Sequence, residues 1–268
     1  MSQVVGFIGA GQMGEPMVSR LLQAGHRVKL FVRRTSVRER MAAAGAQTVD
    51  SVAAAAAADI VIVCVFSDEQ LVQVLDGPSG VLGAASKECV VLSHTTGTMA
   101  TVQDLAAGYP EGPVLLDGPV SGSAEDIAAG RLTVLLGGPA TSVERVRPVL
   151  ESYADTIVAT GALGSALSVK LINNALFAAN AQLVAAATDV GRRWGIGDQE
   201  LLGALLACSA RSYAAESIHR TGGLAKFERM AAPYLRKDLA ACLAATKDNG
   251  IELAQLADVI HHGPLELG

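Results

Sequence analysis

Hydrophobic and polar positions alternate in short blocks over roughly the first 160 residues, and the blocks predict strands followed by helices. Gln3–Gly9 and Asp59–Phe66 are continuous apolar runs, typical of strands buried on both faces. The other predicted elements are helix Met17–Ala24, strand Arg27–Val32, helix Val37–Ala44, extended segment Gln47–Val49, helix Val52–Ala58, helix Asp68–Leu75, strand Cys89–Leu92, helix Met99–Ala107, strands Val114–Asp117 and Leu132–Leu136, and helix Thr141–Leu150. This order predicts an α/β fold with a doubly wound parallel sheet.

The pattern changes after this α/β region, because no strand is evident from Leu163 onward. We therefore expect two domains, residues 1–161 and an all-helical domain of residues 162–268 that begins with a long interdomain helix. The predicted helices of the second domain are Ser165–Arg193, Asp198–Ala207, Ser212–His219 and Leu235–Thr246.

Lys170 is the only charged residue between Leu163 and Ala187. Asn173 and Asn174 follow at i+3 and i+4, so the three polar side chains share one helical face. Such a stripe is typical of a helix that lines a site. A surface lysine followed by two satisfied amides is the alternative, and the stripe alone does not decide between them.

A glycine-rich segment lies between the first predicted strand and the first predicted helix, and it reads Gly9-Ala10-Gly11-Gln12-Met13-Gly14. In this context Gly-x-Gly-x-x-Gly indicates a Rossmann-type dinucleotide site. The glycines allow a tight turn, a close approach of the pyrophosphate and close packing of the helix on the strand. The helix N-terminus supplies amide groups to the phosphates.

The end of the second strand predicts which dinucleotide binds. An NAD site usually carries an acidic residue here, but this chain has Arg33, Arg34 and Thr35, with no acid before Glu39. Guanidinium groups suit the 2′-phosphate of NADP, which a carboxylate would repel. We therefore expect NADP(H) rather than NAD(H), although surface arginines after a strand are also common.

Composition is consistent with a cytoplasmic enzyme. The net charge of −5 argues against nucleic-acid binding, and four widely spaced cysteines suggest reduced thiols. No basic leader precedes an apolar segment, polar residues interrupt the apolar stretch after Lys170, and the five histidines lack metal-ligand spacing. We expect no secretion, no membrane span and no metal. His261 and His262 are expected in an exposed tail.

Three loops are predicted at the carboxyl ends of strands, where doubly wound sheets bind ligands. They are Phe66–Asp68, Ser93–Gly97 and Asp117–Ser123. The glycines and serines of the last loop can present amides and hydroxyls to a carboxylate. Each loop by itself could be a solvated turn, and we expect His94 to be a solvated loop histidine.

The whole pattern resembles the β-hydroxyacid dehydrogenases, which include 3-hydroxyisobutyrate dehydrogenase, tartronate semialdehyde reductase and glyoxylate/succinic semialdehyde reductase. Four ordered blocks carry the resemblance over nearly the whole chain: the fingerprint Gly6–Gly14, the block Asp117–Gly122, the block Gly161–Asn174, and Lys237-Asp238-Leu239.

The resemblance implies hydride transfer between a nicotinamide and a small β-hydroxyacid or semialdehyde. It implies Lys170 as the acid/base and Asn174 as the residue that orients the substrate. Ser121 and Gly122, with Ser123 beside them, would bind the substrate carboxylate. The implied contacts to the nicotinamide half of the cofactor are Val65, Phe66, Gln70, Thr96 and Lys237. The family also implies a homodimer formed through the helical domain.

Several positions depart from the family pattern. Ser123 stands where a second glycine is usual, and Asp126 and Ile127 stand where small residues are usual. Ser93 and Met99 replace the usual aspartate and proline, and the chain ends before the usual final helix. An acid beside a carboxylate-binding loop fits a solvent-facing side chain or a cationic or hydroxyl-bearing substrate, so the substrate stays open.

Three alternatives remain. Imine reductases share the architecture but usually replace the lysine by an acid or a tyrosine, although Asp126 could reflect an amine-like substrate. The 6-phosphogluconate dehydrogenases share the lysine but have a larger helical domain. The third alternative is a non-catalytic NADPH-binding interaction module.

Overall fold

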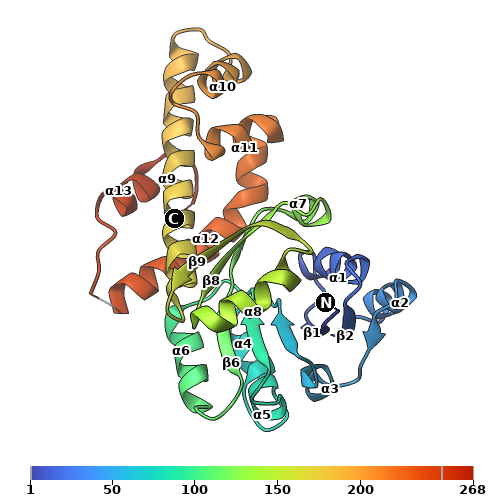
Figure 1. The fold of residues 1–268 in the computed structure, drawn as a ribbon. Coiled ribbons are helices and arrows are strands. Elements are labelled where there is room, and N and C mark those ends of the chain that lie inside the picture. Colours follow the sequence, from blue (N-terminus) through green and yellow to red (C-terminus); the bar gives the residue numbers. More distant parts are fainter. Residues whose placement is uncertain (1, 249, 268) are drawn as a thin grey trace. The chain divides into compact units, whose positions relative to one another are not determined.

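The computed structural model describes residues 2–248 and 250–267 and divides the chain into two compact units, Met1–Lys170 and Leu171–Gly268. The division falls within one continuous helix, α9 (Ser165–Arg193). The predicted domain boundary, after residue 161, stays a prediction. In Figure 1 α9 is the long yellow helix.

Unit 1 is built on a nine-stranded sheet within the described residues, in the order β3-β2-β1-β4-β5-β6-β8-β7, with β9 paired to β8. The pairs from β3 to β6 are parallel, β8 is antiparallel to β6 and β7, and β9 is parallel to β8. The strands are β1 (Val4–Ile8), β2 (Arg27–Phe31), β3 (Gln47–Thr48), β4 (Ile60–Val63), β5 (Val90–Ser93), β6 (Val114–Asp117), β7 (Val120–Ser121), β8 (Leu132–Gly137) and β9 (Ala154–Gly161). The predicted doubly wound α/β fold is confirmed.

Helices connect the strands and bury both faces of the sheet. They are α1 (Gly14–Gln23), α2 (Thr35–Ala43), α3 (Val52–Ala56), α4 (Asp68–Leu75), α5 (Val81–Ala84), α6 (Met99–Gly108), α7 (Ala124–Ala128) and α8 (Ala140–Leu150). Alternate residues of β4 supply two different cores: Ile60 and Ile62 join one hydrophobic cluster, and Val61 and Val63 join the other. This two-sided burial explains the uninterrupted apolar runs of the central strands.

The sequence pattern predicted β3 and α3 but missed three other short elements of unit 1, α5, α7 and β7, and the last strand, β9. β9 is mostly exposed, so its sequence, ADTIVATG, lacks a continuous apolar run. α5 and α7 are four and five residues long, and such short helices show little helical periodicity. β7 is a two-residue strand within the loop that follows β6. An edge strand and single-turn helices depend on their tertiary partners more than on their own pattern.

Unit 2 has no strand among its described residues and contains the rest of α9 with α10 (Asp198–Ala207), α11 (Tyr213–Thr221), α12 (Leu224–Asp248) and α13 (Gln255–His262), joined by loops. α12 starts before Pro233, where the sequence pattern began the helix at Leu235. The expectation that His261 and His262 belong to a tail is wrong, because both end α13, although both are exposed.

A buried glutamine fixes the chain after α13 onto α9. Gln182 is 1% exposed, and its Nε2 donates to the carbonyls of Ile260 and Leu265 over 2.9 and 2.7 Å. Its Oε1 accepts from the Leu265 amide over 2.7 Å. These three bonds satisfy the buried amide, whose burial without partners would be costly.

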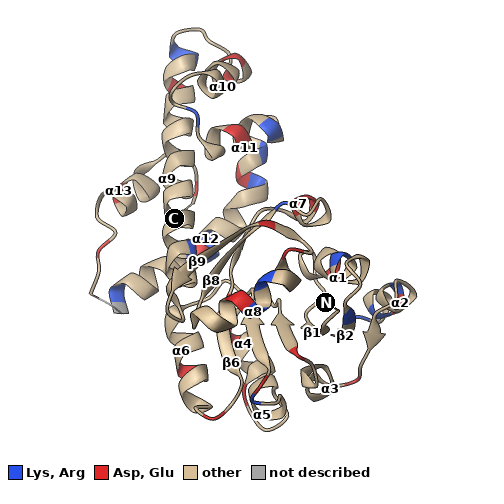
Figure 2. Ribbon diagram, in the orientation of Figure 1, with Lys and Arg blue, Asp and Glu red and all other residues tan. Residues whose placement is uncertain are grey.

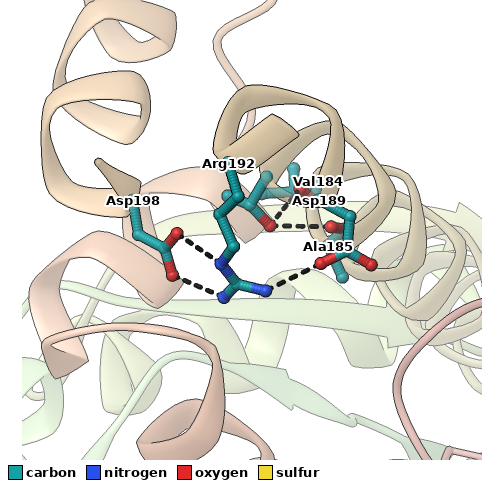
Figure 3. A network of polar contacts seen from close by, with 6 residues as sticks. Val184, Ala185, Asp189, Arg192 and Asp198 are labelled. Atoms are coloured by element: carbon teal, nitrogen blue, oxygen red, sulfur yellow. Dashed lines mark hydrogen bonds and ion pairs between the residues drawn. The ribbon is translucent and has the colours of Figure 1, made fainter. Parts of the chain in front are cut away.

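The end of α9 is joined to the start of α10 by an exposed ion-pair network, shown in Figure 3. The Arg192 guanidinium donates to both carboxylate oxygens of Asp198 over 2.8 and 2.7 Å, and to Asp189 over 2.7 Å. Earlier along the helix, α9 is almost uncharged (Figure 2). Among the described residues, no helix is long and apolar enough to cross a membrane.

Candidate active site

The predicted phosphate loop runs from the end of β1 to the start of α1. Gly9 has a φ of +97°, and a Cβ there would lie 2.2 Å from the carbonyl oxygen of Cys64. A Cβ on Gly14 would lie 2.3 Å from the oxygen of Gly9, whereas a Cβ on Gly11 would meet nothing within 4 Å. Gly9 and Gly14 are therefore required for packing, and Gly11 leaves open space where a phosphate can approach the backbone.

A cavity of about 430 Å³ opens beside this loop in unit 1. Eight residues predicted to bind the cofactor line it: Gly9, Ala10, Gly11, Arg33, Arg34, Val65, Phe66 and Gln70. Val52, Gln73 and Val74 also line it, although no sequence motif marks them. Phe66 is 61% exposed at the cavity. The lining combines glycine amides, apolar walls and two cations, which fits a dinucleotide.

Arg34 is positioned by the phosphate loop itself. Its Nη2 donates to the carbonyl of Ala10 over 3.2 Å, and the residue lines both the first cavity and a second cavity of about 580 Å³ that Gln12 also lines. The acid nearest the loop, Glu15, accepts two hydrogen bonds of 3.0 Å from Arg40, which lower the pKa of its carboxyl. Glu15 is held by Arg40, and it also interacts with Arg34, with which it lines the second cavity.

The loops after β4 and β5 are tied to each other. The Val65 amide donates to Oγ1 of Thr95 over 3.3 Å, and the Phe66 amide donates to Oε1 of Gln70 over 3.2 Å. Asp68, in the first turn of α4, accepts from the amide of Thr98 over 2.9 Å. These bonds hold the two loops that carry the predicted nicotinamide contacts.

Other residues predicted to bind the cofactor lie outside the lining of the first cavity. Thr35 is exposed at the start of α2, and Met13 packs against the core beside the N-terminus of α1. Thr96 is half-buried in the loop after β5. Lys237 belongs to α12 in unit 2.

His94 is buried, so the expectation of a solvated histidine is wrong. The side chain is 3% exposed, its Nδ1 contacts the carbonyl of Gly118, and its Nε2 lies 2.8 Å from the hydroxyl of the fully buried Tyr153. Burial lowers the pKa of His94 to about 4. A neutral imidazole with both nitrogens paired serves as a structural link between β5 and the Asp117–Ser123 loop.

The predicted substrate loop follows β6. Ser121 and Gly122 are exposed, and Gly122 has a φ of +134°. Ser123 forms a capping box with Asp126: its hydroxyl accepts from the Asp126 amide over 3.2 Å, and the Asp126 carboxylate accepts from the Ser123 amide over 2.9 Å. Asp126 also pairs with Arg131 over 3.4 Å. These bonds explain the unusual acid as a helix cap rather than as a ligand for a cationic substrate.

Lys170 lies in the second turn of α9 and is half-buried. The helix begins against Asp117, whose carboxylate is fully buried and accepts from the amides of Gly164 and Leu167, each over 2.8 Å. All of these residues belong to unit 1. Because an α-helix has a regular geometry, this anchoring also fixes the position of the Lys170 backbone relative to the loop after β6.

Asn174 is 7% exposed, and its partners lie in unit 2. Its Nδ2 donates to Oδ2 of Asp238 over 2.6 Å, and its Oδ1 accepts from the side-chain Nδ2 of Asn173 over 3.1 Å. Asp238 was not among the predicted site residues, although it lies in the Lys237-Asp238-Leu239 block. A buried amide held by a carboxylate has a fixed orientation.

Comparisons with known proteins agree with this geometry. Residues 4–161 match the model of the NAD binding domain of 6-phosphogluconate dehydrogenase. The 2-(hydroxymethyl)glutarate dehydrogenase of Eubacterium barkeri is 30% identical over 265 residues, 94% of this chain and 85% of the relative. Mitochondrial 3-hydroxyisobutyrate dehydrogenase of Mus musculus is 30% identical over 222 residues, 82% and 66% of the two chains. The structure of Mycobacterium tuberculosis 3-hydroxyisobutyrate dehydrogenase with L-serine matches with a TM-score of 0.85 at 26% identity, covering 97% and 92%.

The fold and the phosphate loop define an oxidoreductase that uses a nicotinamide cofactor. Within that class, the chain belongs to the β-hydroxyacid dehydrogenase family, and the predicted resemblance is confirmed. No group of three or more metal-ligating side chains occurs in the part of the chain that the structure describes.

Proposed function

We propose that this protein transfers a hydride between NADP(H) and a small β-hydroxyacid or the matching semialdehyde, with Lys170 as general acid/base. The observation that carries the proposal is the cavity of unit 1, where the glycine loop and two arginines meet apolar walls. The cofactor, when bound, supplies or accepts the hydride. The residues of the chain bind and orient the cofactor and the substrate, and Lys170 exchanges the proton.

The preference for NADP rests on Arg33 and Arg34. Both line the cavity at the end of β2, and the acid expected there in an NAD site is missing. Arg34 is already oriented by Ala10. Glu15 interacts with Arg34, but its two hydrogen bonds go to Arg40, which supports a phosphate over a ribose hydroxyl.

The roles proposed for the other residues follow from their chemistry. Ser121 and Gly122 offer an exposed hydroxyl and amide to the substrate carboxylate. Asn174 orients the substrate. Lys170 gives its proton to the carbonyl oxygen during reduction and removes it from the alcohol during oxidation. The remaining cofactor contacts proposed are Gln12, Met13, Gly14, Thr35, Thr96 and Lys237, together with the cavity residues named above.

We also infer a homodimer formed through the helical unit. Exposed apolar side chains recur on α9 and directly after it at spacings of four and seven residues: Ile172, Leu176, Leu183 and Val190 on the helix, and Trp194 just beyond its end. An apolar stripe of this length on a single chain is typical of a surface that a second protein covers.

The test is NADPH oxidation by the native protein with glyoxylate, succinic semialdehyde and tartronate semialdehyde, in parallel with cyclic imines and with NADH. We expect turnover with at least one carboxylate-bearing aldehyde, and roughly tenfold or greater preference for NADPH in kcat/KM. Turnover of imines alone would favour an imine reductase. Tight NADPH binding without turnover of any compound would favour a non-catalytic binding module.

A further inference from the structure

Asp117 caps helix α9, although it lies far from that helix in the sequence. The first amides of any α-helix lack partners within the helix, and a side chain at the cap position usually satisfies one of them. Four helices of unit 1 follow this rule, because Ser51, Ser67, Thr98 and Ser123 cap α3, α4, α6 and α7. α9 does not, because the four residues before it, Gly-Ala-Leu-Gly, carry no side-chain oxygen.

The cap of α9 is supplied instead by the end of β6. Oδ1 of Asp117 accepts from the Gly164 amide and Oδ2 accepts from the Leu167 amide, each over 2.8 Å. The side chain is fully buried, which raises the pKa of its carboxyl, and the hydrogen bonds from the Gly164 and Leu167 amides at the start of α9 oppose that rise. A Cβ on Gly137, the partner of Asp117 across the sheet, would lie 2.2 Å from Oδ1, so glycine at this position makes room for the carboxylate.

We propose that Asp117 is a positioning residue for Lys170, holding the first turn of α9 so that the lysine stands at a fixed place relative to the substrate loop. This inference rests on the proposed function. Lys170 follows Leu167 by three residues and therefore lies one turn further along the same side of the helix. Asp117 precedes Ser121 by four residues. Its carboxylate therefore connects two parts of the proposed site: the substrate-binding loop after β6, and helix α9, which carries the proton donor.

Other side-chain contacts at the same turn include the Thr160 and Ser165 hydroxyls, 2.7 Å apart, which pair with each other and not with a helix amide. Gln103 of α6 donates to the carbonyl of Leu163 over 3.2 Å, and the Ser168 hydroxyl lies 3.7 Å from the sulfur of Met99. Neither contact satisfies a leading amide of α9. Without Asp117 two buried amides lose their acceptor, which favours fraying of the first turn. A displacement of a reacting group by about 1 Å can lower turnover by about 10²-fold.

The experiment compares the native full-length protein with Asp117→Asn and Asp117→Ala. Asparagine keeps the shape and one acceptor, whereas alanine keeps neither acceptor. Val149→Ala is the control for lost stability, because Val149 is fully buried in α8, a helix without a proposed site residue. The readouts are amide hydrogen exchange over residues 162–170, the Kd of NADPH, and kcat and KM for the best carbonyl substrate.

We expect graded changes in the order native, Asp117→Asn, Asp117→Ala. Exchange at Gly164 and Leu167 accelerates and kcat falls by about tenfold or more in Asp117→Asn, while the Kd of NADPH and KM change by less than about threefold. If alanine prevents folding, the asparagine variant carries the test alone. Val149→Ala leaves kcat and the exchange of this segment unchanged at a temperature where all variants are folded.

Three results would overturn the inference: unchanged exchange in Asp117→Asn, faster exchange with unchanged kcat, or losses of kcat that Val149→Ala reproduces. The proposed function fails by a separate observation, the absence of turnover in the native protein. In that case the exchange data still decide whether Asp117 holds the turn, and a positioning role in catalysis is rejected.

Discussion

The side-chain amide of Asn174 donates a hydrogen bond to the carboxylate of Asp238 over 2.6 Å, within unit 2. The bond leaves Asn174 with a fixed orientation, because its Oδ1 is also engaged, by Asn173. A polar group with a fixed orientation binds a substrate without first losing rotamer freedom.

Replacing Asp238 should therefore impair turnover through Asn174. We expect Asp238→Ala to lower kcat/KM by about tenfold, because Asn174 loses the acceptor that orients it. Steady-state kinetics with the best carbonyl substrate measure the effect. Asp258→Ala, the loss of an exposed acid on α13, is the control and should keep native kinetics. Equal activity of the two variants would contradict the role given to this bond.

Alanine substitutions at two glycines of the phosphate loop should affect different properties, stability at Gly14 and cofactor affinity at Gly11. Gly14→Ala places a Cβ against a backbone oxygen, so we expect the free energy of unfolding to fall by about 1–3 kcal/mol. Gly11→Ala places its Cβ in open space, so stability should stay native while the Kd of NADPH rises about tenfold or more. Thermal unfolding and cofactor titration separate the two effects. Native affinity in Gly11→Ala would contradict the placement of the phosphate beside Gly11.

Arg34 should set the preference between cofactors. We expect Arg34→Ala to lower kcat/KM for NADPH by about tenfold while kcat/KM for NADH changes little, because only NADPH carries the 2′-phosphate. Arg38→Ala is the matched control, since Arg38 is paired with Asp50 and does not line the cavity. A parallel loss with both cofactors would place Arg34 elsewhere than at the 2′-phosphate.

His94 should make the fold sensitive to acid. Its pKa is about 4 in the fold against the ordinary 6.5, so the unfolded chain binds a proton that the fold excludes. The free energy of unfolding should therefore fall as the pH drops through this window, by about 3 kcal/mol in total from this group. Denaturant titrations of native protein and His94→Gln should show a shallower pH dependence in the variant. The exposed His262, replaced in the same way, should keep the native slope, and equal slopes for all three would contradict the account.

The sequence predicted those parts of the fold and site that depend on local pattern. The phosphate loop is six consecutive residues from Gly9 to Gly14, and its glycines are required by backbone contacts within the same β-α-β unit. The central strands were visible because burial on both faces makes them continuously apolar. α9 was predicted with its observed bounds, Ser165–Arg193, because a helix of 29 residues repeats its helical pattern over many turns.

The sequence could not predict features that depend on partners far along the chain. His94 is buried because Tyr153, 59 residues later, covers it. Asp117 caps α9 across 47 and 50 residues, and no local pattern records that pairing. Asp126 looked like a possible ligand until its bonds to Ser123 were visible, although Ser-x-x-Asp is itself a capping pattern.

The most direct test of the central claim compares native protein with Lys170→Ala. The account predicts that kcat for NADPH-dependent reduction of the best semialdehyde falls by about 10²–10⁴-fold, because the carbonyl oxygen loses its proton donor. The Kd of NADPH should stay native, because the dinucleotide cavity of unit 1 does not include Lys170. Native turnover in Lys170→Ala would contradict the assignment of Lys170 as the acid/base.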